Sequence, residues 1–148
     1  MKISAKGRYA LFSCICLAQE YKFGEYLTVI SISEKLGISK IYLEQVFSLL
    51  KRGGLVTAFK GAQGGYMLSR PPQQISIFEV LSAVETSIFE VAEETAGQNS
   101  PEMEAAVKEL VFTKLDSAVK LTLEQISLFD LAAETEKKKA DGNFMFFI

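Results

Sequence analysis

Residues 28–52 have the sequence TVISISEKLGISKIYLEQVFSLLKR, which contains two short amphipathic segments joined at Gly37. Thr28 is a favoured N-cap residue and predicts the start of a helix over 29–36. Beyond the turn that Gly37 supplies, the periodicity predicts a longer helix over 40–52. Two helices joined by a short glycine-bearing turn indicate a helix-turn-helix.

The longer of these helices has two chemically different faces. Four of its apolar residues recur at helical spacing and are expected to be buried: Leu43, Val46, Phe47 and Leu50. Its N-terminal end, where Ser39 is expected to act as the cap, offers polar groups that suit nucleic acid, because Gln reads adenine, Lys reads guanine or phosphate, and helix-terminal amides hold phosphate. The candidate residues there are Ser39, Lys40, Tyr42 and Gln45. For Tyr42, packing against the first helix is an equal alternative.

A glycine-rich β-hairpin is expected after this helix. One strand is predicted over 55–60, a turn over 61–64 and a return strand over 65–70. Lys60 and Arg70 make this hairpin a basic wing, which could lie along a minor groove. The alternative is a hairpin that only closes the core, and that role would not need Lys60 at the tip.

Charge divides the chain in two. Residues 1–72 carry a net charge of +6 and residues 73–148 a net charge of −8, within an overall charge of −2. A basic half of this kind is expected to bind a polyanion, with nucleic acid as the default candidate. The alternative is a solvated surface with uneven charges.

Composition argues against an enzyme and against a metal site. The chain has no histidine, which removes His-based catalytic triads and Cys/His zinc sites. Its two cysteines, Cys14 and Cys16, are two residues apart on a predicted helix and are expected to be small core residues. The acidic residues cluster on predicted helix surfaces rather than as a catalytic pair. We therefore expect no catalytic residues, no metal and no cofactor.

The N-terminal segment imitates a signal peptide. Lys2, Lys6 and Arg8 precede the apolar run 10–18, but this run is too short to span a bilayer and no A-x-A site follows it. It fits a buried first helix over 6–21, so we expect a cytoplasmic protein without a membrane partner.

The second half begins after Pro71 and Pro72. A capping box of Ser76 and Glu79 predicts a helix to about Glu85, and an acidic loop is expected over 89–99.

A long helix is then predicted from Pro101, with an apolar stripe formed by Met103, Val107, Leu110, Val111, Leu115 and Ala118. Such a stripe is expected to pack against a twin helix in a dimer, with packing on its own domain as the alternative. By the same capping logic, Thr122 and Gln125 are expected to start a last short helix.

These elements predict a mainly α protein with a small β-hairpin wing. We divide it into a winged helix-turn-helix DNA-binding domain over 1–86, a linker loop, dimerisation helix and short helix over 87–136, and a C-terminal tail over 137–148. The tail ends in the apolar run FMFFI over 144–148. We expect this run either to pack on its own dimer or to be captured by another protein through side chains and carboxylate.

Three sequence blocks resemble a known family. They are MKISAKGRYA over 1–10, YLEQ over 42–45, and GAQGGY over 61–66 followed by Pro71. In this order and spacing they resemble the IscR/NsrR/CymR-type family of winged helix-turn-helix bacterial transcriptional regulators, and the resemblance covers residues 1–86.

The resemblance implies a homodimer that binds an imperfect palindrome in double-stranded DNA. Family members contact DNA through the second helix of the motif, the wing and the start of the first helix, which here points to Lys6, Arg8, Ser39, Lys40, Tyr42, Gln45 and Lys60. The position of Lys60 is commonly Arg in the family, and lysine lacks the guanidinium fork, so a softer minor-groove preference is expected.

One departure and one further likeness refine this reading. Cluster-binding members carry cysteines between the domain and the long helix, whereas residues 89–99 contain none, so a member without an iron–sulfur cluster is expected.

The aromatic tail closing on isoleucine resembles the cysteine-metabolism repressors of the family (CymR). This implies a repressor of cysteine or sulfur genes that associates with cysteine synthase through Phe146, Phe147 and Ile148. The alternatives are a winged helix that only holds other proteins, and a family member that responds to another signal.

Overall fold

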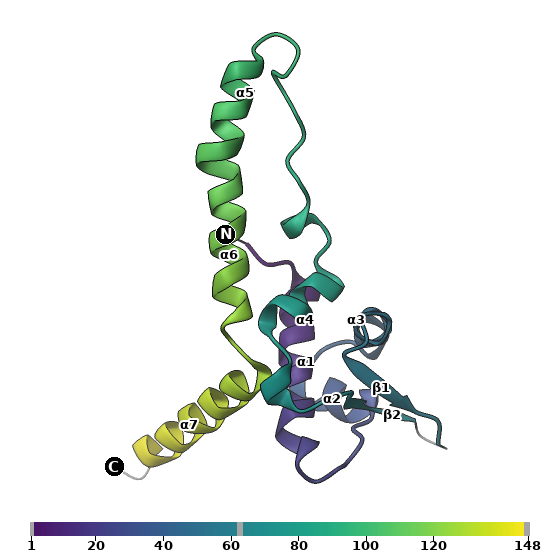
Figure 1. Ribbon diagram of the computed structural model, residues 1–148. Helices are drawn as coiled ribbons and strands as arrows, with labels where there is room; N and C mark the ends of the chain where they lie inside the picture. The colour runs from purple at the N-terminus through teal and green to yellow at the C-terminus, as the bar shows by residue number, and fades with distance from the viewer. Residues whose placement is uncertain (1, 62–63, 147–148) are drawn as a thin grey trace.

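The computed structural model describes residues 2–61 and 64–146, with side chains described as far as Asn143. It is mostly helical with one two-stranded antiparallel hairpin, so the predicted class of a mainly α protein with a small β wing is confirmed (Figure 1). The elements in chain order are α1 (Ala5–Tyr21), α2 (Val29–Leu36), α3 (Lys40–Arg52), β1 (Val56–Phe59), β2 (Gly65–Leu68), the 3₁₀ turn η1 (Pro72–Gln74), α4 (Ile77–Val84), the 3₁₀ turn η2 (Ser87–Phe89), α5 (Pro101–Val107), the π turn η3 (Lys108–Phe112), α6 (Thr113–Glu124) and α7 (Leu128–Phe146).

The helices α1 to α4 and the hairpin form a compact body around one apolar core, with α1 packed against both α3 and α4 (Figure 1). The predicted inner face of α3 is confirmed, because the four residues predicted to form it have no exposed surface: Leu43, Val46, Phe47 and Leu50. Cys14 and Cys16 are buried in α1, as expected for core residues.

The helix-turn-helix has the boundaries that its sequence predicts. The Thr28 hydroxyl accepts a hydrogen bond from the Ser31 N–H at 3.0 Å, which caps α2. Gly37 then turns the chain with a φ of 67°, a left-handed conformation that glycine adopts without strain. Ser39 is the N-cap residue of α3, as predicted, but its side chain makes no capping hydrogen bond.

The hairpin is anchored to the body at its inner end. Its strands pair from Val56↔Leu68 to Phe59↔Gly65, and Leu27 adds a short bridge to Tyr66 with backbone hydrogen bonds of 2.8 and 2.9 Å. The Tyr66 ring stacks on the buried Phe47 ring of α3 at 4.5 Å between centroids. This contact sets the position of the hairpin relative to α3. Ala62 and Gln63 of the predicted turn lie outside the described residues.

The predicted long helix is present as a helical arm made of α5, η3 and α6, which rises from the body with residues 87–100 beside it (Figure 1). Its apolar stripe does not pack on the body, because the exposed fractions of Met103, Val107, Leu110 and Leu115 are 66%, 44%, 62% and 55%. No helix among the described residues is both long and apolar enough to cross a membrane.

The last helix differs from its prediction. The Thr122 hydroxyl donates to the Ala118 carbonyl inside α6, so Thr122 does not start a helix. Instead, Ser127 and Asp130 cap each other's backbone N–H groups at 2.9 and 3.1 Å, and the 19-residue helix α7 follows.

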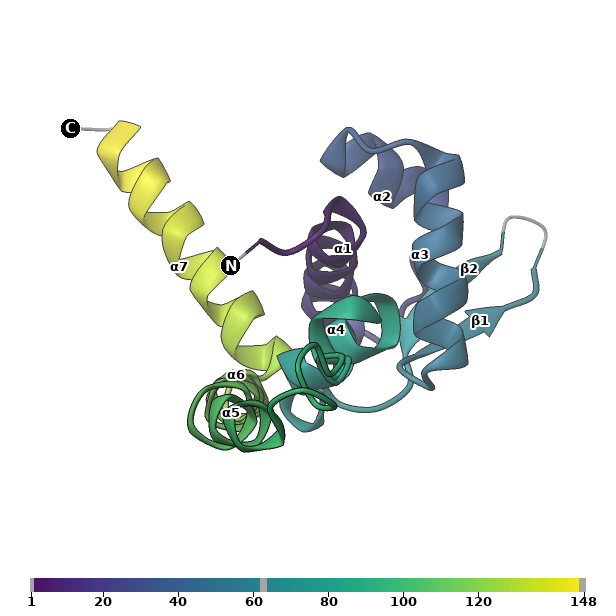
Figure 2. The ribbon, with the colours of Figure 1, turned by 90° about the horizontal axis from the view of Figure 1, so that it is seen from above.

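The start of α7 belongs to the core of the body. Leu128 has no exposed surface, its N–H donates to the Ile75 carbonyl at 2.9 Å, and the Ile77 N–H donates to the Ile126 carbonyl at 2.8 Å. Figure 2 shows α7 leaving this point and diverging from α1. The segment predicted as a tail is therefore helical as far as Phe146, while the Phe146 side chain and residues 147–148 lie outside the described part.

Candidate nucleic-acid interface

The start of α1 and the outer face of α3 lie beside each other. Lys6 and Gln45, which are distant in sequence, line the same open depression of about 500 Å³, together with Ile41, Glu44, Ser48 and Leu49. The structure thus brings together a predicted phosphate-binding lysine and the predicted base-reading glutamine.

A buried carboxylate fixes the start of α1. The Ser4 N–H donates to Glu85 Oε1 at 3.1 Å, the Ser4 hydroxyl also donates to this oxygen, and Ser4 Oγ accepts from the Gly7 N–H at 3.2 Å. Glu85 is only 7% exposed and follows directly after α4. An added Cβ on Gly7 would lie 2.5 Å from Glu85 Oε1, so a larger residue here would push this carboxylate out of place.

This anchor lies directly before the basic side chains of α1. Lys6 is half-buried and Arg8 is exposed in the first turn that Ser4 caps. Sequence reasoning identified Lys6 and Arg8 but missed Ser4 and Glu85. The Ser4–Gly7 spacing signals the cap locally, whereas nothing local indicates a partner 81 positions away.

Lys40, the first residue of α3, lies beside the hairpin. It borders a depression of about 420 Å³ whose other residues are Val29, Ile30, Glu44, Ala58, Phe59, Gly64, Gly65 and Tyr66. Its ammonium is 3.7 Å from the Glu44 carboxylate, and both side chains are about half exposed, at 53% and 54%. An exposed pair of this kind contributes only about 0–1 kcal/mol, so Lys40 can exchange Glu44 for a phosphate at small cost.

The other predicted residues of α3 differ in their surroundings. Ser39 and Gln45 are exposed. Tyr42 is half-buried, and its ring packs edge-on against Tyr9 of α1 at 5.2 Å between centroids. The expected alternative of packing against the first helix is therefore present for Tyr42.

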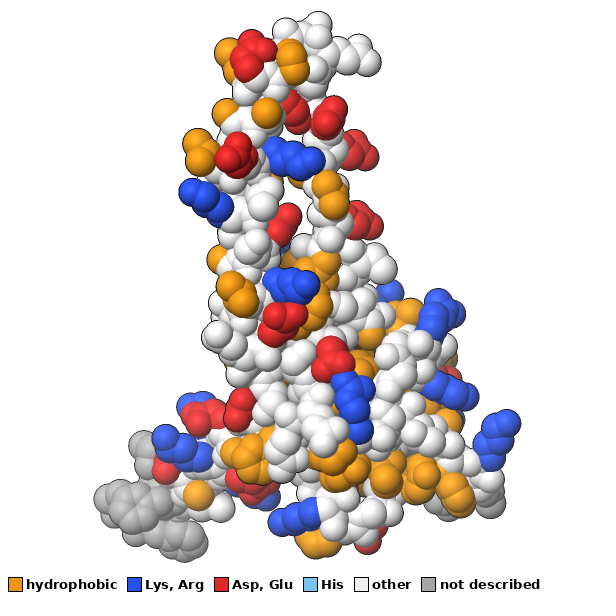
Figure 3. Space-filling view, in the orientation of Figure 1, with side chains coloured by type: hydrophobic (Ala, Val, Ile, Leu, Met, Phe, Trp, Pro, Cys, Tyr) orange, Lys and Arg blue, Asp and Glu red, His pale blue; other side chains and the backbone are white. Residues whose placement is uncertain are grey.

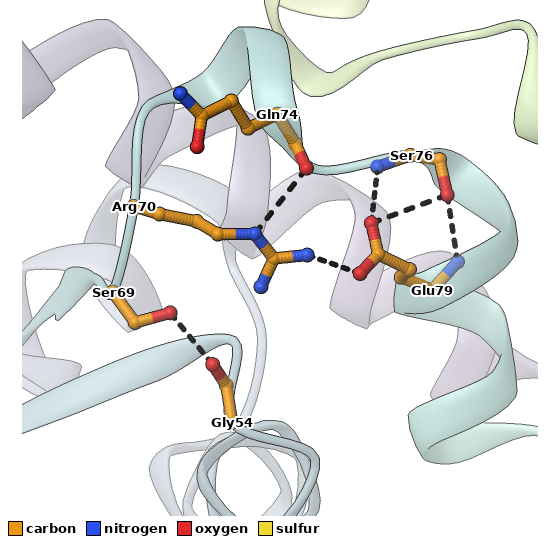
Figure 4. Close-up of polar contacts among 6 residues, drawn as sticks. All are labelled: Gly54, Ser69, Arg70, Gln74, Ser76 and Glu79. Atoms are coloured by element: carbon orange, nitrogen blue, oxygen red, sulfur yellow. Dashed lines mark hydrogen bonds and ion pairs between the residues drawn. The ribbon is translucent and has the colours of Figure 1, made fainter.

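Arg70 does not serve as a free cation of the wing. Its Nη2 donates to the Glu79 carboxylate and its Nε donates to the Gln74 carbonyl at 3.3 Å (Figure 4). The prediction that Arg70 adds charge to the wing was wrong, because this contact ties the end of the hairpin to α4. Lys60 is exposed after β1 and forms no ion pair with any described residue, so it keeps its charge available.

The Glu79 carboxylate has two structural roles. Besides accepting a hydrogen bond from Arg70, the carboxylate accepts one from the Ser76 N–H at 2.9 Å. The backbone N–H of Glu79 in turn donates to Ser76 Oγ, and the two bonds confirm the predicted capping box (Figure 4). Partial burial raises the pKa of Glu79, but the hydrogen bonds from Ser76 and Arg70 outweigh it and hold the pKa below its ordinary value.

The charges are distributed as the sequence predicts. Figure 3 shows Lys and Arg side chains along the edge of the body where Figure 1 places α3 and the hairpin, whereas the arm and the segment beside it carry many acidic side chains interspersed with lysines. The cations along this edge could attract a polyanion.

The donor groups do not fit a metal cluster held by thiolates. Cys14 is fully buried, and burial, followed by the neighbouring Cys16, raises the pKa of its thiol to about 12. Burial also raises the pKa of Cys16. Residues 90–100 contain no cysteine, and the described residues include no group of three His, Cys, Asp or Glu side chains able to hold a metal.

Comparison with known proteins identifies similar sequences and structures. The Rrf2 family model, described as an iron-dependent transcriptional regulator, matches residues 3–134. The regulator IscR of Cereibacter sphaeroides is 44% identical over 89 residues, which cover 60% of this chain but only 57% of that protein. The structure of CymR, described as the global cysteine regulator of B. subtilis, is similar with a TM-score of 0.72 and 34% identity over 90% of this chain and 98% of that one. The structure of IscR from T. potens has a TM-score of 0.72 and 30% identity over 93% and 90% of the two chains.

Proposed function

Since the chain belongs to the Rrf2 family of transcriptional regulators, we propose that it binds a palindromic operator as a dimer and represses genes of cysteine or sulfur metabolism. DNA binding follows from the family, whereas the dimer, the repression, the target genes and the residues involved form our proposal.

The observation that carries the proposal is a pair of depressions that share Glu44: one lined by Lys6 of α1 and Gln45 of α3, the other bordered by Lys40 beside the hairpin. Around them we assign phosphate contacts to Lys6, Arg8, Lys40 and Lys60, which are cations on three different elements. Gln45, exposed on α3, suits the N6 and N7 atoms of adenine in the major groove. Ser39 lies where the free N–H groups of α3 face outward and can hold a phosphate. For Tyr42 we propose a contact through its hydroxyl while the ring stays packed on Tyr9.

Dimerisation is supported by the arm. A stripe of aliphatic side chains between 44% and 66% exposed is unfavourable in water and suits a twin helix related by two-fold symmetry: Met103, Val107, Leu110, Val111 and Leu115. A two-fold dimer would present two α3 helices to the two halves of a palindrome.

Two observations support the cysteine branch without a cluster. The chain aligns with 98% of a structure described as a global cysteine regulator, and its cysteines are buried thiols rather than accessible ligands. We further propose that Phe146, Phe147 and Ile148 bind cysteine synthase. In that case the signal that controls DNA binding would be a partner protein rather than a small ligand.

A fluorescence anisotropy titration tests the proposal. The purified protein is titrated against its own upstream DNA and against a scrambled duplex at two salt concentrations, with and without cysteine synthase. Tighter, salt-sensitive binding to the native duplex is expected, together with a shift when the enzyme is added. The shift should disappear when Ile148 is deleted.

Each result has a distinct meaning. Equal affinity for the two duplexes would refute sequence-specific regulation and would favour a winged helix that holds other proteins. Specific binding that ignores cysteine synthase would refute the proposed partner and leave a regulator that responds to another signal.

A further inference from the structure

Ile41 is the second residue of α3, and 71% of its side chain is exposed. Successive residues of an α-helix are about 100° apart around its axis. On that basis Ile41 points almost directly away from the buried side of the helix, the centre of which is formed by Leu43, Val46, Phe47 and Leu50. The outermost position of the first turn of α3 is thus occupied by a large aliphatic side chain.

Exposure alone would not need an explanation, because single apolar side chains are common on protein surfaces. The neighbours of Ile41 make its position informative. It shares one depression with Lys6 and Gln45, the proposed contacts to phosphate and to adenine. A base contacted by Ile41 would therefore lie next to the phosphate contacted by Lys6 and the adenine contacted by Gln45 in the proposed interface.

The geometry points to Ile41 as a residue that reads sequence by packing against the C5 methyl group of thymine. In the major groove only thymine presents a methyl group, so an aliphatic side chain at this position distinguishes it from the other three bases. This inference rests on the proposed function, because it requires α3 to enter the major groove. It adds a residue that recognises its base by an apolar contact, beside the polar contact of Gln45.

Replacing thymine by deoxyuridine tests this contact directly. Deoxyuridine lacks the methyl group but keeps the same pairing edge and the same O4 acceptor. We compare the native upstream duplex with one in which every thymine is deoxyuridine, using the wild-type protein and the Ile41→Ala variant. The Val91→Ala variant is the matched control, since Val91 is 78% exposed and lies in the segment beside the arm.

Wild-type protein should bind the deoxyuridine duplex about fourfold more weakly for each thymine that Ile41 contacts, the factor expected for burying one methyl-sized group. Ile41→Ala should bind the native duplex more weakly by a similar factor and should lose its dependence on the methyl group. Val91→Ala should behave as the wild type. Single replacements along the duplex then identify which thymine is read.

Changes in DNA shape caused by deoxyuridine act equally on both proteins, so the double comparison isolates the contact. An equal deoxyuridine penalty for wild type and Ile41→Ala would overturn the inference, as would the absence of any penalty for the wild type. The second result needs no variant and does not depend on how Ile41→Ala folds. If the wild type does not prefer its native duplex over a scrambled one, the proposed function fails and this inference fails with it.

Discussion

Replacing Leu110 by aspartate is expected to convert the proposed dimer into monomers. Leu110 lies in η3, in the middle of the arm, and is 62% exposed. Full burial of a leucine side chain is worth about 1.5–3 kcal/mol, so covering its exposed part contributes about 1–2 kcal/mol in each protomer. A two-fold contact loses this amount twice, and each buried aspartate adds a desolvation penalty of several kcal/mol. The dissociation constant of the dimer should therefore rise by a factor on the order of 10⁴ or more.

Sedimentation velocity over a series of protein concentrations measures this change. Ala105→Asp is the matched control, because residue 105 is exposed and lies on the opposite side of α5 from Met103 and Val107. It adds the same charge to the arm and should leave the dimer intact. If Leu110→Asp sediments as the wild type does, the stripe is not the dimer interface, and a monomeric wild type would refute the dimer itself.

Three further variants test the polar contacts. Glu79→Gln should lower the free energy of unfolding by about 1 kcal/mol. The folded-state pKa of Glu79 is lowered, so its contribution to the free energy of unfolding is present above the unfolded pKa and disappears as the pH falls through the folded pKa. The melting temperatures of wild type and variant should therefore converge in acid. A difference in melting temperature that stays constant with pH would contradict this reading. Lys60→Gln should reduce the slope of log affinity against log salt by about 1.8, since a dimer loses two phosphate contacts, whereas Lys137→Gln on α7 should leave the slope unchanged. Gln45→Ala should relax the preference at one base position by about 1–3 kcal/mol in a panel of single-base operator variants, and a uniform loss over the panel would remove Gln45 from base reading.

Local chemistry explains why the helix-turn-helix could be predicted to the residue. Thr28 caps α2 through its own hydroxyl, and Gly37 turns the chain through its own backbone conformation, so both signals act within a few residues. The buried face of α3 follows from helical period alone. The exposed cations of the candidate interface, Arg8 and Lys60, could likewise be found from residue type and position.

Long-range contacts account for what the sequence did not predict. The partner of Ser4 is 81 positions away, and the bond between Arg70 and Glu79 depends on how the hairpin returns to α4. The start of α7 was misplaced because Thr122 and Ser127 are both plausible caps. Burial of Leu128 in the core decides between them, and no local pattern contains that contact.

The position of Leu128 also orders the events of synthesis. The ribosome releases α3 and the hairpin well before it releases Leu128, because the whole arm is made in between. Until then, the growing chain lacks the side chain that completes the core next to Ile75 and Ile77. The nascent protein therefore exposes this apolar surface while the aliphatic stripe of the arm is also emerging. Aggregation or capture by a chaperone is most favoured between the release of the hairpin and the release of Leu128.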